Sequence, residues 1–192
     1  MAKTRSESLT LFINCHEIFQ FAEEFLRAAN IIGKTQAGLL YQSLPSAATM
    51  APTAVNSALA LELYLKCLLC ISGLKYKGAH NSKELFERLP IEHQASIEKL
   101  AESYALGSPS LLRVQQENPT IIPDLKITTV LDLSGDAFVL FRYAYERTGV
   151  GPYGFIAGHV TDAVREVIMQ LKTEWKSQFD QPSSNADPRL CT

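Results

Sequence analysis

Two pairs of opposite charges interrupt otherwise apolar helical segments of this sequence. Glu62 and Lys66 are four residues apart in ALALELYLKCLLCISG, and Arg142 and Glu146 repeat that spacing in VLFRYAYE. Residues four apart share one face of a helix. Because a charge removed from water costs several kcal/mol unless it is paired, such side chains are expected to meet opposite charges. We therefore expect the two helices to pack side by side, with these four charges facing one another.

A histidine and a basic loop lie close to the first pair along the chain. His80 directly precedes a short helical pattern, and Lys75 and Lys77 lie in the loop before it. An imidazole titrates near neutral pH and suits general acid–base work, whereas Lys and Arg side chains hold phosphate. His80, Arg142 and Glu146 are thus the candidate catalytic residues. The candidate substrate or phosphate ligands are Glu62, Lys66, Lys75 and Lys77. The four helical charges fit a structural ion network that fixes helix register equally well.

Apolar periodicity indicates the elements that must position these groups. Hydrophobic residues recur at helical spacing through most of the chain, and no alternating strand pattern is found. The sequence predicts an all-α fold, an up-and-down bundle of four long helices with one or two short ones. The expected helices cover residues 9–32, 52–72, 82–89, 91–106, 132–149 and 154–179. Helix 52–72 is apolar on every side and should form the centre of the bundle.

Helix ends and one aromatic contact are also predicted. Gly73 has the position that commonly terminates a helix, and Asn81 with Glu84 has the spacing of a capping box. A connection containing Gly33, Gly38 and Pro45 is expected to end the first helix. Near the end of the last helix, Trp175 and Phe179 are expected to pack against helix 9–32.

Composition limits the class of protein. The 192 residues carry 18 Lys and Arg against 20 Asp and Glu, so no overall positive field favours nucleic acid, and any RNA partner needs a local patch. The four cysteines are few and mostly surrounded by apolar residues, which favours free thiols, with Cys67 and Cys70 as core filling rather than a zinc or redox pair. No run approaches the ~18 apolar residues that span a bilayer. We expect a cytoplasmic protein without a membrane partner, one domain at residues 1–178, and a tail without fixed structure at 179–192.

A family resemblance rests on the order of these polar positions. ALALELYLKCLLCISG, the loop LKYKG and then AHNSKELFERLP resemble the core of HEPN domains, and FRYAYE is similar to the Arg-Tyr-x-x-Glu stretch of some prokaryotic HEPN-like proteins. The resemblance covers roughly residues 53 to 175. It implies a helical bundle that forms homodimers and uses no metal or cofactor. Many members are ribonucleases of toxin–antitoxin and phage-defence systems, whereas others bind nucleotides or proteins without catalysis.

The chain departs from the ribonuclease members at one motif. Those members carry an Arg followed four to six residues later by a His, but the residues at this spacing after Arg142 are Glu146, Arg147 and Thr148. A ribonuclease would therefore require His80 or Glu146 to take the proton while Arg142 and Lys66 hold the phosphate. Two function classes follow: an RNA-acting toxin or defence protein with a nonstandard or degenerate site, or a non-catalytic module. The module would bind a nucleotide, an antitoxin-like protein or a second copy of the chain.

Overall fold

The computed structural model describes residues 14–40, 47–108, 126–135 and 158–179, and over these ranges the chain is all-α, without a strand. The long helices are α1 (Cys15–Leu40), α2 (Ala47–Ile71), α4 (Ile91–Leu106) and α8 (Gly158–Leu171). The shorter elements are α3 (Ser82–Glu87), α6 (Ile127–Gly135), the 3-10 turn η2 (Thr173–Trp175) and α9 (Lys176–Phe179). The all-helical prediction is confirmed.

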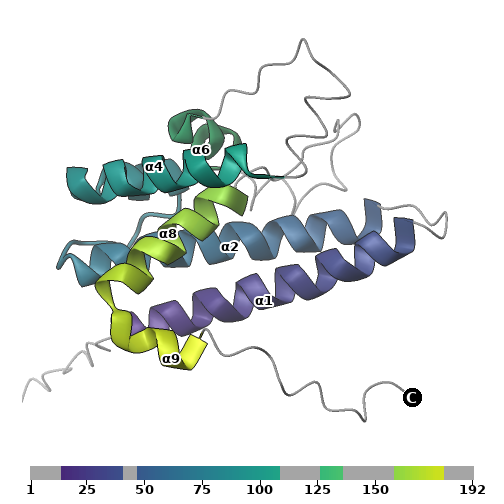
Figure 1. Cartoon of the computed structure of the whole chain (residues 1–192), viewed down its shortest axis with the longest axis horizontal. Helices are drawn as coiled ribbons and strands as arrows, with labels where there is room; N and C mark the ends of the chain where they lie inside the picture. Colours follow the sequence, from purple (N-terminus) through teal and green to yellow (C-terminus); the bar gives the residue numbers. More distant parts are fainter. Residues whose placement is uncertain (1–13, 41–46, 109–125, 136–157, 180–192) are drawn as a thin grey trace, which may run out of the picture.

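Helix α2 lies at the centre of the packing. It runs antiparallel to α1, and α8 crosses over it, while α3 packs near its end (Figure 1). Helix α4 packs against α8, and α6 packs against α3. The side chains of α2 that are fully buried come from every side of the helix: Ala60, Leu61, Tyr64, Leu65, Cys67, Leu68 and Leu69. An apolar helix without a polar face is stable only when neighbours surround it, which explains its central place.

The apolar length of α2 exceeds what the sequence prediction allowed. The window Ala51–Ile71 is the one described helix long and apolar enough to cross a membrane by length and composition, and half of it is buried inside the protein. Glu62 and Lys66 lie within this window, and α1, α3 and α8 pack against the helix. The buried central helix of a globular fold passes the same test of length and composition.

The predicted end of α2 and the predicted start of α3 are confirmed. Gly73 has φ of 69°, a left-handed conformation that suits glycine, and the Leu74 amide donates to the Leu69 carbonyl at 2.9 Å to close the end of α2. The Asn81 side chain accepts from the Glu84 amide at 3.1 Å, as a capping residue of α3 should. Each of these two signals lies within a few residues of the helix end that it marks, so no tertiary information was needed to predict it.

Helix α1 continues beyond the predicted end at residue 32 and reaches Leu40. A glycine inside a helix costs only ~1 kcal/mol relative to alanine, so packing overrides it. Gly33 faces α2, where a Cβ atom at this position would lie 3.8 Å from Thr53 Cγ2. The connection that the sequence places at Gly33 and Gly38 is therefore wrong, and both glycines belong to the helix.

The last predicted helix is divided. Its chain bends at Lys172, which has φ of −125° and ψ of 60°, before η2 and α9. The bend turns the final residues onto the start of α1. There the Phe19 ring lies 5.3 Å from the Trp175 ring and 4.9 Å from the Phe179 ring, measured between centroids. The predicted packing of these aromatic residues against the first helix is confirmed. The prediction of one continuous helix over residues 154–179 is wrong.

The cysteine prediction is wrong for two of its residues. Cys15 and Cys70 form a disulfide with an S–S distance of 2.11 Å, whereas Cys67 is a buried free thiol, as predicted. The antiparallel arrangement places the start of α1 beside the end of α2, although these cysteines are 55 residues apart in the sequence. Local patterns carry no information on such a pairing.

Several other predictions fall on residues outside the described ranges. They include most of helix 132–149, of which the structure describes only the overlap with α6, and most of the tail at 179–192. Helix α6 begins at Ile127, five residues before the predicted start.

Candidate functional site

The structure brings Glu62, Lys66 and His80 together at the end of α2. The Lys66 ammonium donates to Glu62 Oε1 at 2.6 Å, and His80 Nδ1 lies 3.1 Å from the same oxygen. The side chains of Glu62 and Lys66 are each 13% exposed, whereas that of His80 is 76% exposed. One carboxylate oxygen therefore joins a nearly buried ammonium group to an imidazole in solvent. We call these three residues the α2 cluster.

Local structure places His80 beside α2. The chain leaves α2 through the left-handed turn at Gly73 and returns to it before α3. On either side of His80, Ala79 is buried and Asn81 caps α3. The backbone of the histidine is thus held between a core contact and a capped helix. An exposed side chain on a backbone fixed at both sides can keep its position next to Glu62.

The Glu62 carboxylate sets the chemistry of the imidazole. When Nδ1 carries a proton, it donates that proton to Glu62 Oε1 and leaves Nε2 as a proton acceptor. An acidic partner of this kind orients the imidazole in His-based catalysis. The Lys66 ammonium keeps the carboxylate in place and balances its charge. The α2 cluster thus has the parts of an oriented acid–base histidine.

Basic side chains are exposed in the loop between α2 and α3. Lys75 and Lys77 are both exposed and make no ion pair with another residue of the described ranges. In contrast, Lys83 bonds to Asp132 at 2.8 Å, which raises the pKa of the lysine, and Arg88 pairs with Glu84. Lys75 and Lys77 are therefore the lysines of this region best able to bind phosphate.

Arg142 and Glu146, the other predicted members of the site, lie outside the described residues. The expectation that they face Glu62 and Lys66 across two helices stays a prediction. Among the described residues, no group of three His, Cys, Asp or Glu side chains is arranged to hold a metal ion.

Sequence reasoning missed a second charged centre, which joins three helices. Glu23 of α1 accepts from the Tyr64 hydroxyl of α2 at 2.7 Å and from Arg165 Nε of α8 at 2.6 Å. Tyr64 is fully buried, and burial together with the Glu23 carboxylate raises the pKa of its hydroxyl far above the ordinary value. The only sequence signal was the position of Glu23 and Arg165 next to core residues of amphipathic helices. Their pairing spans 142 residues and was not predictable locally.

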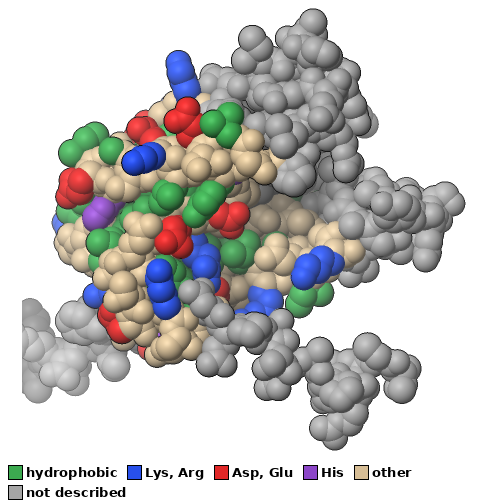
Figure 2. Space-filling view, viewed as in Figure 1, with side chains coloured by type: hydrophobic (Ala, Val, Ile, Leu, Met, Phe, Trp, Pro, Cys, Tyr) green, Lys and Arg blue, Asp and Glu red, His purple; other side chains and the backbone are tan. Residues whose placement is uncertain are grey.

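An open cavity of about 270 Å³ adjoins this second centre and is lined by Tyr104, Asp162, Arg165 and Glu166. Acidic and basic side chains gather near the middle of this face, over α8 (Figure 2). Asp162 is exposed as a residue, but its carboxyl group is partly desolvated, and burial raises its pKa although Arg165 opposes the shift. Since Glu23 already balances Arg165, the two remaining carboxylates make this cavity unsuited to phosphate.

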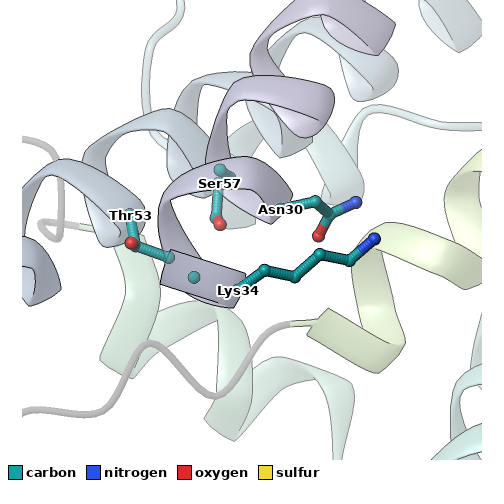
Figure 3. A pocket seen from close by; sticks show the side chains of 6 residues that line it. Asn30, Lys34, Thr53 and Ser57 are labelled. Atoms are coloured by element: carbon teal, nitrogen blue, oxygen red, sulfur yellow. The ribbon is translucent and has the colours of Figure 1, made fainter. Parts of the chain in front are cut away.

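A second cavity lies between α1 and α2, at the opposite end from the disulfide. It has a volume of about 300 Å³ and is lined by Ala29, Asn30, Gly33, Lys34, Thr53 and Ser57. Asn30 and Lys34 extend side by side from α1, away from Thr53 and Ser57 (Figure 3). The lining includes no carboxylate and no histidine, so it has no acid–base group. Of the three places, the α2 cluster alone combines a histidine, an orienting carboxylate and nearby unpaired lysines.

Comparison with known proteins adds no relative: no protein-family model matches the chain, and neither a curated protein nor a solved structure matches it.

Proposed function

We propose that the protein acts on RNA as a HEPN-like ribonuclease that needs no metal, in a toxin–antitoxin or phage-defence system. The observation that carries the proposal is the contact between His80 Nδ1 and Glu62 Oε1, because it gives an exposed imidazole a carboxylate partner. The resemblance of the surrounding sequence to HEPN domains supports the same assignment. The site is nonstandard, because a His80–Glu62 pair takes the place of the Arg and His motif of the ribonuclease members.

The proposed reaction is cleavage of the RNA chain by its own 2′-hydroxyl. His80 Nε2 removes the proton from the 2′-hydroxyl, the 2′-oxygen attacks phosphorus, and the bond to the 5′-oxygen breaks. The leaving oxygen takes a proton, and the products are a 2′,3′-cyclic phosphate and a 5′-hydroxyl. Lys75 and Lys77 hold the phosphate by charge, and Lys66 acts mainly by fixing Glu62. In the proposal Arg142 adds a second phosphate contact, and Glu146 supplies the proton to the leaving group.

The proposal includes a wider architecture. We propose an up-and-down bundle of four long helices that forms a homodimer in the cytoplasm, without a membrane partner and with an antitoxin-like protein as a candidate regulator. Such a homodimer would contain two copies of the α2 cluster. Exposed apolar surface on α1 supports this arrangement, because Phe21 and Ile31 on this helix are 55% and 60% exposed.

A second function is supported by the low exposure of Glu62 and Lys66. At 13% each, with a 2.6 Å bond between them, the two charges already satisfy one another. A buried, mutually satisfied pair is typical of a structural ion network. In this alternative the protein is a non-catalytic module that binds a nucleotide or another protein, and His80 with Lys75 and Lys77 serves as a binding surface.

Incubation of the purified protein with labelled tRNA and a pool of single-stranded RNA, in the presence of EDTA, separates the two functions. The ribonuclease proposal expects cleavage by the wild type and loss of cleavage in the His80→Ala, Arg142→Ala double variant. His93→Ala is the matched control, because His93 lies on α4 and takes no part in the contacts that join Glu62, Lys66 and His80, so its removal should leave cleavage unchanged. No cleavage by the folded wild type at high concentration contradicts the ribonuclease and favours the module.

A further inference from the structure

Three sulfur atoms meet where α1 begins and α2 ends. Cys15 and Cys70 are bonded to one another, and Cys67, one helical turn before Cys70, donates its thiol hydrogen to the Cys15 carbonyl at 3.3 Å. Cys15 and Cys70 are half-buried at the edge of the core, whereas Cys67 is fully buried. The disulfide therefore lies closer to solvent than the free thiol does.

Cys67 does not compete for the disulfide. Burial raises the pKa of its thiol from 9.0 to about 12, against the opposing charge of Lys172. At neutral pH only about one molecule in 10⁵ then carries the thiolate that attacks disulfides. The Cys15–Cys70 bond thus stays as it is until an external thiol arrives.

The bond holds the helix end from which the loop of the α2 cluster departs. The Cys70 carbonyl accepts the Gly73 amide at 3.0 Å, and the Leu74 amide closes the same end on the Leu69 carbonyl. Lys75, Lys77 and His80 follow within the next seven residues. A covalent bond at Cys70 therefore restrains the end of α2, where the loop that carries these three side chains begins.

Cys15, the other cysteine of the disulfide, restrains the first turn of α1. Asn14 caps the start of α1, where its carbonyl accepts the amides of Glu17 and Ile18 at 3.0 and 3.2 Å. The next residue after Cys15 is His16, whose ring bonds to Gln178 at 3.0 Å and lies 5.0 Å from the Trp175 ring. Release of Cys15 would loosen the capped first turn of α1 and the contacts of His16 with η2 and α9.

We propose that Cys15–Cys70 is a reversible redox latch that holds the loop of the α2 cluster and the first turn of α1 when oxidised, and releases both when a dithiol reduces it. In the reduction, the S–S bond breaks, two S–H bonds form at Cys15 and Cys70, and the dithiol closes into its own disulfide. Two electrons and two protons pass from the dithiol to the protein. The inference concerns the mobility of these segments and does not rest on RNA cleavage.

The direction of attack follows from the position of each sulfur. Cys15 is the first residue of α1, at the positive end of the helix dipole, which stabilises a negative charge, whereas Cys70 is at the helix end that disfavours one. Cys15 is therefore the better leaving thiolate, and the incoming thiolate attacks the sulfur of Cys70. Brief exposure to glutathione followed by alkylation should give the mixed disulfide on Cys70, and a mixed disulfide mainly on Cys15 would refute this direction.

Hydrogen exchange of the whole protein with and without dithiothreitol tests the latch. Reduction should speed exchange of the Glu17, Ile18, Gly73 and Leu74 amides roughly tenfold while α4 changes little. The Cys15→Ser, Cys70→Ser variant should behave like the reduced protein and ignore dithiothreitol, and Cys67→Ala should respond like the wild type. Equal acceleration of all amides, no acceleration of these four, or a native protein without the Cys15–Cys70 bond would each overturn the proposal.

Discussion

Replacement of Glu23 by alanine tests the second charged centre and the way in which α1, α2 and α8 are joined. Glu23 accepts the Tyr64 hydroxyl at 2.7 Å and two nitrogens of Arg165 at 2.6 and 3.3 Å. The glutamate side chain is only 12% exposed and that of Arg165 22%, so solvent screens their charges weakly. Glu23→Ala removes the carboxylate that accepts hydrogen bonds from both the buried Tyr64 hydroxyl and the largely buried Arg165 guanidinium.

The expected loss of stability follows from these contacts. A fully buried hydroxyl left without its acceptor costs about 1–3 kcal/mol. Breaking a largely buried charge pair adds a similar amount, reduced because water can reach part of Arg165. We expect Glu23→Ala to lower the free energy of unfolding by about 3 kcal/mol, which corresponds to a melting temperature lower by roughly 9 °C in a chain of this size.

Urea unfolding of five proteins, the wild type and four variants, measures this effect. Tyr64→Phe removes only the hydroxyl and leaves Glu23 paired with Arg165, so it should cost about 1 kcal/mol. Glu23→Ala should cost less in the Tyr64→Phe background than in the wild type, because the two side chains interact directly. Glu24→Ala, at the exposed neighbouring position, is the control and should be close to neutral. A Glu23→Ala effect no larger than that of Glu24→Ala would refute the reasoning.

Four further variants test local predictions by the same unfolding measurement. Gly73→Ala should cost about 1 kcal/mol because alanine is strained at φ of 69°, whereas Gly107→Ala, with ordinary φ and contacts no closer than 3.6 Å, should not destabilise. Asn81→Ala should cost about 1 kcal/mol through the lost cap of α3, and an unchanged midpoint would show that the cap is not needed. The folded protein keeps the Cys67 proton up to a pKa of about 12, while the unfolded chain loses it near 9.0. Stability from this thiol is therefore full below pH 9 and falls by up to about 4 kcal/mol as the pH rises to 12, and a Cys67→Ala variant with the same fall would contradict this.

Local features of the fold were predictable because they depend on neighbouring residues. The capping signals at Asn81 and Gly73 and the limits of α4 follow from side chains within a few positions of each helix end. The contact between Glu62 and Lys66 follows from helical spacing alone. Such features are fixed before tertiary packing contributes.

Features that depend on packing were missed or wrong. Gly33 stays helical because α1 packs on α2, and the energetic cost of a helical glycine is smaller than that gain. The disulfide and the contact of Glu23 with Arg165 join segments 55 and 142 residues apart, which no periodicity links. His80 is intermediate, because the sequence places it close to Glu62 along the chain, whereas the 3.1 Å contact itself depends on how the loop folds back onto α2.

The rate of RNA cleavage in EDTA by the wild type, Glu62→Gln, His80→Ala and the double variant tests the central claim most directly. If Glu62 acts by orienting the His80 imidazole, the two residues work as a unit, and the double variant should be no slower than His80→Ala alone. We expect losses of about 10² to 10⁴ for His80→Ala, the range of a general acid–base group. Cleavage that survives His80→Ala unchanged, or no cleavage by the folded wild type, would contradict the assignment of the α2 cluster as a ribonuclease site.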